Sequence, residues 1–314
     1  MRWRGLLALA GLLVTLGAAG CAQEAGESPT SGGQARPSGS PQVVVTTNIL
    51  GDVVTQLVGD QVEVRTLMAP NADPHSFGVS AQVAAQMQQA DLLVANGLGL
   101  EEGLLDHVES ARSAGTAIFE AGEHLTPLEY NTEEASGVDP HFWTDPTVMA
   151  EVVTALESAL AENVTGVDTA RLQSATSEYL AELDALDRDM ATRFAAIPKA
   201  HRALVTNHHV FGYMARRYDF RLIGAVIPGG ATLAAPSASD LADLADAVRE
   251  AGVPAIFADS SQPDRLVRAL AEHTGVEVAV VPLYTESLTA SDGEASTYLD
   301  MMHVNTDRIE DALT

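Results

Sequence analysis

Residues 168–197 read DTARLQSATSEYLAELDALDRDMATRFAAI and carry one apolar stripe along their whole length. The stripe repeats at steps of three and four residues, the spacing of one helix face: Leu172, Thr176, Tyr179, Leu183, Leu186, Met190, Phe194 and Ile197. Such a helix begins near Asp168 and ends before Pro198, and about 28 residues at 1.5 Å each make a rod of ~42 Å. A plain surface helix also fits, but this length matches the width of a two-lobed body. We therefore expect a stiff helix that packs across two lobes and allows little hinge motion.

Apolar runs alternate with amphipathic stretches on both sides of this helix, which is typical of parallel strands and their covering helices. Before it, the sequence predicts strands at 43–47, 62–67, 92–95 and 116–119 and helices at 51–58, 80–89 and 101–114. After it, strands are predicted at 203–206, 221–227, 255–258 and 276–281 and helices at 209–217, 237–251, 263–274 and 295–313. The expected fold class is α/β, with two α/β lobes joined by one long rigid backbone helix. The expected domains are a lobe over 43–165, the linking helix over 166–198 and a second lobe over 199–314.

The first 21 residues have the pattern of a secretory signal. Arg2 and Arg4 precede an apolar run over 5–20, which is shorter than the roughly 20 residues that a membrane-spanning helix needs. The run ends at Cys21, the only cysteine, and Ala-Ala-Gly-Cys at 18–21 resembles a bacterial lipobox. We expect a lipoprotein signal peptide over 1–21, lipidation of Cys21 and an anchor in the cell membrane, with free secretion after an ordinary cleavage as the alternative. Residues 22–42 are rich in Gly, Ser, Pro and Glu, which predicts a flexible tether.

Composition excludes several classes of protein. The chain has 43 Asp and Glu against 17 Lys and Arg, a formal net charge of −26 at pH 7, so its surface repels phosphate and no nucleic-acid partner is expected. A hydrophobic content of 46% excludes a disordered chain. A single cysteine excludes a disulfide framework and cysteine-based zinc sites. Any bound metal must therefore be held by histidines and carboxylates.

The tripeptide Asp-Pro-His occurs twice, at 73–75 and at 139–141. Because proline fixes φ and biases the preceding residue to an extended form, each loop presents its histidine rigidly, as a metal ligand requires. His75 and His141 are therefore candidate ligands, and Asp73 and Asp139 are candidates to orient the imidazole that follows each of them.

A third candidate ligand follows the strand predicted at 203–206, at the end of the strand where open α/β sheets place ligands. His208 and His209 point differently on a regular backbone, so we expect only one of them to bind. A fourth ligand is expected from the Tyr-Thr-Glu-Ser-Leu segment at 284–288. Two ligands then come from each lobe, and the metal lies between them. Three imidazoles and a carboxylate suit Zn²⁺ best, whereas Mn²⁺ favours more oxygen donors.

Several motifs in combination make the chain resemble the zinc/manganese solute-binding lipoproteins of bacterial ABC importers, over essentially everything from residue 43 to the end. They are Asn71-Ala72-Asp73-Pro74-His75, ADLLVANGLGLE at 90–101, DPHFWTDP at 139–146, Asn207-His208 and YLDMMHVN at 298–305. The resemblance implies two α/β lobes, one long helix and a metal site in the cleft between the lobes. It also implies a receptor that is not an enzyme and that hands its metal to the transmembrane subunit of an ABC permease. A monomer is the expected state.

Carried over from the family, the metal ligands are His75, His141 and His208, with Glu286 at the fourth position, where aspartate is usual. A histidine at the third position favours Zn²⁺ as the cargo, with Mn²⁺ as the alternative. His209 is the candidate for a supporting or substitute ligand. The loop over 124–138 is short and acidic, whereas zinc members of the family often carry a long histidine-rich loop before the second ligand.

Two other classes of function compete with the receptor. A zinc hydrolase would use Glu286 as a general base rather than as a ligand, but neither His-Glu-x-x-His nor Gly-x-Ser-x-Gly is present. A surface adhesin would use the metal only to stabilise its fold.

Overall fold

The computed structural model describes residues 43–130, 136–230, 232 and 235–314, which lie in one compact unit, Pro37–Thr314. The predicted signal peptide over 1–21, with Cys21, and the tether over 22–42 lie outside the described residues. So does part of the acidic loop over 124–138. Within the described ranges, no helix is both long enough and apolar enough to cross a membrane.

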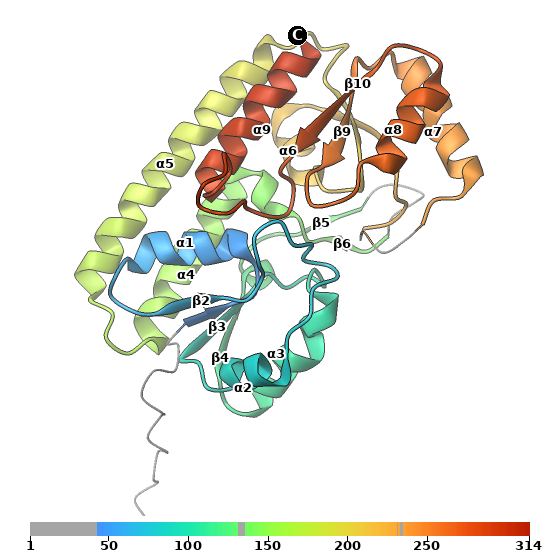
Figure 1. Ribbon diagram of the computed structural model, residues 1–314. Coiled ribbons are helices and arrows are strands. Elements are labelled where there is room, and N and C mark those ends of the chain that lie inside the picture. Colours follow the sequence, from blue (N-terminus) through green and yellow to red (C-terminus); the bar gives the residue numbers. More distant parts are fainter. Residues whose placement is uncertain (1–42, 131–135, 231, 233–234) are drawn as a thin grey trace, which may run out of the picture. The chain divides into compact units, whose positions relative to one another are not determined.

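The first sheet is parallel, with the strand order β2-β1-β3-β4. Its strands are β1 (Val43–Val45), β2 (Val64–Thr66), β3 (Leu92–Ala95) and β4 (Ala117–Glu120). Its helices are α1 (Asn48–Val58), α2 (Ala81–Met87), α3 (Leu105–Ser113) and α4 (Pro146–Asn163). Val43 and Val45 face the core under α1 and α4, while Val44 faces the opposite core with Met87 and Ala111 from α2 and α3. Helices thus cover both faces of the sheet, as a buried parallel sheet requires (Figure 1).

The second sheet is also parallel, with the strand order β10-β9-β7-β8. Its strands are β7 (Ala203–Thr206), β8 (Arg221–Ala225), β9 (Ala255–Asp259) and β10 (Ala279–Leu283). Its helices are α6 (Gly212–Tyr218), α7 (Ala238–Ala251), α8 (Arg265–Thr274) and α9 (Tyr298–Leu313). A capping box of Ser237 and Asp240 begins α7, and Gly252 in the left-handed conformation ends it.

Helix α5 (Thr169–Ala196) joins the two sheets and confirms the long helix predicted from the apolar stripe. The Asp168 carboxylate accepts the N–H groups of Ala170 and Arg171 at 2.9 and 3.2 Å and so caps its first turn. The buried face packs against α1 and α4 on one side of the molecule and against α6 and α9 on the other (Figure 1). One helix therefore supports both sheets, and the α/β class with two lobes and a connecting helix is confirmed.

One helix and one small sheet were not expected. The 18-residue helix α4 begins at Pro146 behind the capping carboxylate of Asp145, where the sequence predicted no element. A two-stranded antiparallel sheet pairs β5 (Leu128–Glu129) with β6 (Val138–Asp139).

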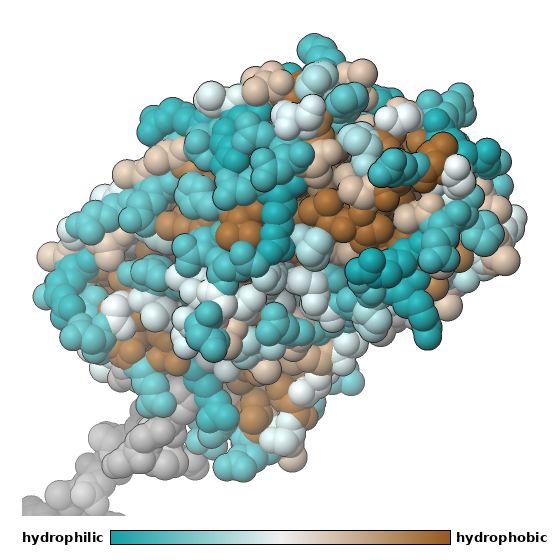
Figure 2. Space-filling view, turned by 45° about the horizontal axis from the view of Figure 1, so that its top comes forward, coloured by the Kyte–Doolittle hydropathy of each residue, from teal (hydrophilic) through white to brown (hydrophobic). Residues whose placement is uncertain are grey.

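One hydrophobic core runs from the first sheet through α5 to the second sheet, and a smaller core lies under α7 and α8. Because the larger core is continuous, it does not divide the chain into lobes. The lobe boundaries given above, 43–165, 166–198 and 199–314, stay a prediction. On the outside, Figure 2 shows hydrophilic side chains interspersed with hydrophobic patches on one face.

Candidate metal centre

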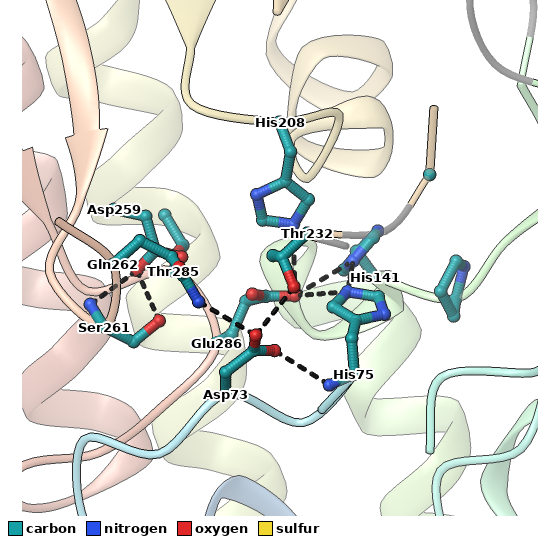
Figure 3. A network of polar contacts seen from close by, with 12 residues as sticks. Asp73, His75, His141, His208, Thr232, Asp259, Ser261, Gln262, Thr285 and Glu286 are labelled. Atoms are coloured by element: carbon teal, nitrogen blue, oxygen red, sulfur yellow. Dashed lines mark hydrogen bonds and ion pairs between the residues drawn. The ribbon is translucent and has the colours of Figure 1, made fainter. Parts of the chain in front are cut away.

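Three imidazoles and one carboxylate meet in the interior between the two sheets. His75, His141, His208 and Glu286 offer ligand atoms that all lie within 4.8 Å of one another, and none of these residues is more than 2% exposed. Oxygen Oε1 of Glu286 is the hub, at 2.9, 3.2 and 3.1 Å from the Nε2 atoms of His75, His141 and His208 (Figure 3). The structure thus brings together the four residues that the sequence proposed as ligands.

Each ligand lies in a loop rather than in a helix or strand. His75 lies between β2 and α2, and His141 directly follows β6. His208 and Glu286 follow the carboxyl ends of β7 and β10, which is where open parallel sheets place their ligands. Each of these loops therefore begins at the end of a strand, namely β2, β6, β7 or β10.

The spacing of the four donors fits a small divalent cation. A tetrahedral zinc site with bonds of 2.0–2.2 Å separates its donors by about 3.3 Å. The closest donor pairs here lie at 2.9–3.3 Å. Within the described part of the chain, the buried Oε2 of Glu286 has no hydrogen-bond partner, and Nε2 of His208 has only the contact with Oε1 of Glu286 at 3.1 Å. A cation among these atoms would supply the partner that Oε2 lacks.

The charges of the site are coupled. Burial raises the pKa of Glu286, but His208, His141 and His75 outweigh it and hold that pKa well below its usual value. Burial lowers the pKa of His141, and contacts with Asp139 and Glu286 outweigh it and raise the value to about 9. Without a cation, the negative charge of Glu286 is therefore balanced by a proton on a neighbouring imidazole.

Asp139 and Asp73 do different things although they occupy the same place in the same tripeptide. Oδ1 of Asp139 lies 2.8 Å from Nδ1 of His141 and turns the opposite nitrogen, Nε2, toward the centre. Asp139 also accepts the backbone N–H of His141 at 3.0 Å, as Asp73 accepts that of His75 at 2.8 Å. Nδ1 of His75, however, has no hydrogen-bond partner within the described residues, so Asp73 does not orient the ring of its histidine. Its other oxygen accepts the hydroxyl of Thr232 at 2.6 Å and the amide of Gln262 at 2.8 Å, so Asp73 bridges to the loops after β8 and β9 (Figure 3).

His209 lies beside the centre but is not one of the four clustered residues. It is buried, and its ring lies 6.2 Å from the ring of Tyr130. Together with Asp139 it lines a cavity behind the site. The hydroxyl of Tyr130 lies 3.2 Å from Nδ1 of His141 and donates to the carbonyl oxygen of Gly230 at 3.3 Å.

Sequence reasoning missed three buried residues around the site. Trp143 donates from Nε1 to the carbonyl oxygen of Thr285 at 2.8 Å, and Asn48 contacts the two residues after Glu286. Asp259 ends β9, and burial and the nearby Glu286 raise its pKa to about 6. Trp143 stands inside the DPHFWTDP motif, which is the only signal that marked any of them.

The chain is similar in sequence to known metal-binding proteins. The family model of the periplasmic zinc-uptake complex component A matches residues 43–312. The chain is 31% identical over 284 residues to the zinc-binding protein TroA of Treponema pallidum, covering 89% of this chain and 91% of TroA. It is 27% identical over 305 residues to the manganese-binding lipoprotein MntA of Halalkalibacterium halodurans, covering 96% of each.

Solved structures show the same fold. The periplasmic zinc-binding protein TroA from Treponema pallidum superposes with a TM-score of 0.81 at 30% identity, covering 88% of this chain and 100% of that one. The match therefore includes both sheets and the helix that joins them. The chain belongs to the family of the periplasmic zinc-uptake component, whose members are the metal-binding receptors of ABC importers.

Proposed function

We propose that this chain captures Zn²⁺ outside the cytoplasm and delivers it to the transmembrane subunit of an ABC-type permease. We further propose that it works as a monomer held at the cell membrane by a lipid on Cys21. The single observation that carries the zinc assignment is the buried cluster of three imidazoles and one carboxylate. Four protein donors of this kind are typical of a closed tetrahedral zinc site.

The preference for zinc over manganese rests on the donor atoms. Three of the four donors are nitrogen, which suits Zn²⁺, whereas Mn²⁺ favours carboxylate and water oxygen. The names of similar proteins differ on the metal, since TroA is named for zinc, MntA for manganese and YfeA of Yersinia pestis for iron. Glu286 retains a second oxygen, Oε2, that could add a fifth bond to a larger cation. Manganese is therefore the alternative cargo.

A hydrolytic role for the same site is not favoured. A catalytic zinc keeps one position open for water, and a general base stands beyond bonding distance of the metal. Here Oε1 of Glu286 lies within 3.2 Å of the Nε2 atoms of all three imidazoles, which supports a role for this carboxylate as the fourth ligand rather than as a general base.

The test is a chelator-competition titration of metal-free residues 22–314, with Zn²⁺ and Mn²⁺ measured side by side. We expect tight one-to-one binding of Zn²⁺, far above Mn²⁺, and its loss in His208→Ala. The matched control is His273→Ala, because His273 is an exposed histidine of α8. Mn²⁺ binding as tight as Zn²⁺ would overturn the choice of metal, and failure to hold either metal would overturn the ligand assignment.

A further inference from the structure

Glu286 lies in a segment that is held from both sides of the molecule. On the side before it, the side chain of Asn305 in α9 pairs with Tyr284, accepting its N–H at 2.9 Å and donating to its carbonyl oxygen at 2.6 Å. From Thr285 to Leu288 the hydrogen bonds to distant residues, those of the Glu286 side chain apart, go instead to Trp143, Asn48 and Asn71, which are associated with the first sheet. The ligand therefore follows the second sheet in sequence but is fixed against the first.

Asn48 makes the central contacts of this attachment. It is the first residue of α1 and is 8% exposed. Its amide nitrogen donates to Oγ of Ser287 at 2.8 Å, and its amide oxygen accepts the N–H of Leu288 at 3.0 Å. The same nitrogen donates to the carbonyl oxygen of Ala69 at 3.2 Å, in the loop that leads to His75. One side chain thus joins two ligand-bearing loops that are far apart in sequence.

Two further hydrogen bonds complete the attachment. The indole N–H of Trp143 donates to the carbonyl oxygen of Thr285 at 2.8 Å. The backbone N–H of Asn71 donates to the carbonyl oxygen of Leu288 at 2.9 Å. Trp143 stands two residues after His141, and its ring packs edge-on against the ring of that ligand at 5.3 Å. Thr285, just before Glu286, is therefore tied to the loop that carries His141, and Leu288, two residues after Glu286, is tied to the loop that carries His75.

His208 is attached differently. Its carbonyl oxygen accepts the hydroxyl of Thr206 at 2.7 Å and the N–H of Val210 at 3.0 Å, all within the turn after β7. His208 meets the other three candidate ligands through its ring, whose Nε2 lies 3.1 Å from Oε1 of Glu286.

On the basis of the proposed function, we propose that Asn48 and Trp143 are positioning residues that hold Glu286 beside His75 and His141. These three donors then form a preorganised half-site, to which His208 adds the fourth donor from the second sheet. A glutamate has one more rotatable bond than aspartate, so fixing the backbone on both sides of Glu286 limits how far its carboxylate can swing. A carboxylate held in this way favours one bond to Zn²⁺ over the larger oxygen set that Mn²⁺ prefers.

The first test compares Asn48→Ala with the parent chain, residues 22–314, in titrations with Zn²⁺, Mn²⁺ and Co²⁺. We expect Zn²⁺ affinity to fall about 10–100-fold, the size of effect known for groups that orient metal ligands. The ratio of Zn²⁺ to Mn²⁺ affinity should fall as well, and the visible bands of tetrahedral Co²⁺ should weaken. The matched control is Asn163→Ala, because among the described residues the Asn163 amide donates only to the carbonyl oxygen of Ala159 in its own helix.

Trp143→Phe and Ser287→Ala are milder changes that disturb the fold less. Trp143→Phe removes the hydrogen bond to Thr285, and Ser287→Ala removes the one from Asn48 together with a long 3.5 Å contact to the carbonyl oxygen of Leu288. Each should shift Zn²⁺ affinity and the Co²⁺ bands in the same direction as Asn48→Ala, by less. If folded variants lose thermal stability but keep the parent's Zn²⁺ affinity and Co²⁺ spectrum, the residues are merely structural and the positioning role is refuted. A parent chain that binds no metal would instead refute the proposed function, so the two failures are distinguishable.

Discussion

We expect Zn²⁺ binding to release about one proton at neutral pH, and that proton comes from His141. A zinc-bound imidazole must give up the proton on its ligand nitrogen. In the metal-free protein, burial lowers the pKa of His141, and Asp139 and Glu286 outweigh it and raise that pKa to about 9. At pH 7, two units below this value, only about one molecule in 100 has a neutral His141. The free energy of removing this proton, about 3 kcal/mol at pH 7, therefore opposes Zn²⁺ binding, and the apparent affinity should rise about tenfold per pH unit up to about pH 9.

Isothermal titration calorimetry measures this directly. Heats of Zn²⁺ binding at pH 7 in buffers of different ionisation enthalpy give the number of protons released. We expect about one proton in the parent chain and fewer in Asp139→Asn, which removes the negative charge 2.8 Å from Nδ1 of His141. A binding heat that does not depend on the buffer, with flat affinity between pH 7 and 9, would refute the coupling between His141, Asp139 and Glu286.

Three further predictions concern the surroundings of the site. The free energy of unfolding of the metal-free protein should fall by up to about 3 kcal/mol as the pH rises from 6.5 to 9. The raised pKa of His141 contributes stability that is fully present below pH 6.5 and is lost as the pH rises through 9. A melting temperature that stays constant over this range would contradict this prediction. Gly212→Ala should weaken Zn²⁺ about tenfold, because its Cβ would overlap Oδ2 of Asp139, whereas Gly78→Ala has open space and should leave titrations unchanged. Gln262→Ala should speed Zn²⁺ release into excess chelator about tenfold, because the bond to Asp73 that joins the two lobes is lost. The exposed pair of Gln56 with Asp52 offers Gln56→Ala as its control, and equal release rates would show that this bond does not retain the metal.

Much of the fold followed from local patterns. The stripe in 168–197 predicted α5 to within a residue or two at each end, because one face of a helix must bury its apolar residues wherever it lies. The strands over 92–95 and 203–206 were placed at their observed bounds for a similar reason, since a strand buried on both faces needs a continuous apolar run. Helix α4 was missed, because its valines and alanines suit strands and helices alike, and packing against α5 selects the helix.

Local sequence marked His75 and His141 through their rigid Asp-Pro-His loops, and it marked the segments at 207–209 and 284–288 through their place just past a parallel strand. The choice of His208 over His209 came from the family resemblance. The residues that hold those donors in place by hydrogen bonds were decided only by the tertiary structure. Asn48 and Ser287 are 239 positions apart and meet only when both lobes pack on α5. Asp73 and Asp139 are each followed by proline and histidine, yet Asp73 accepts a hydrogen bond from Gln262 in the other lobe, whereas Asp139 orients the imidazole of His141. Local sequence fixes which atoms can bind, and long-range packing fixes which groups hold those atoms in place.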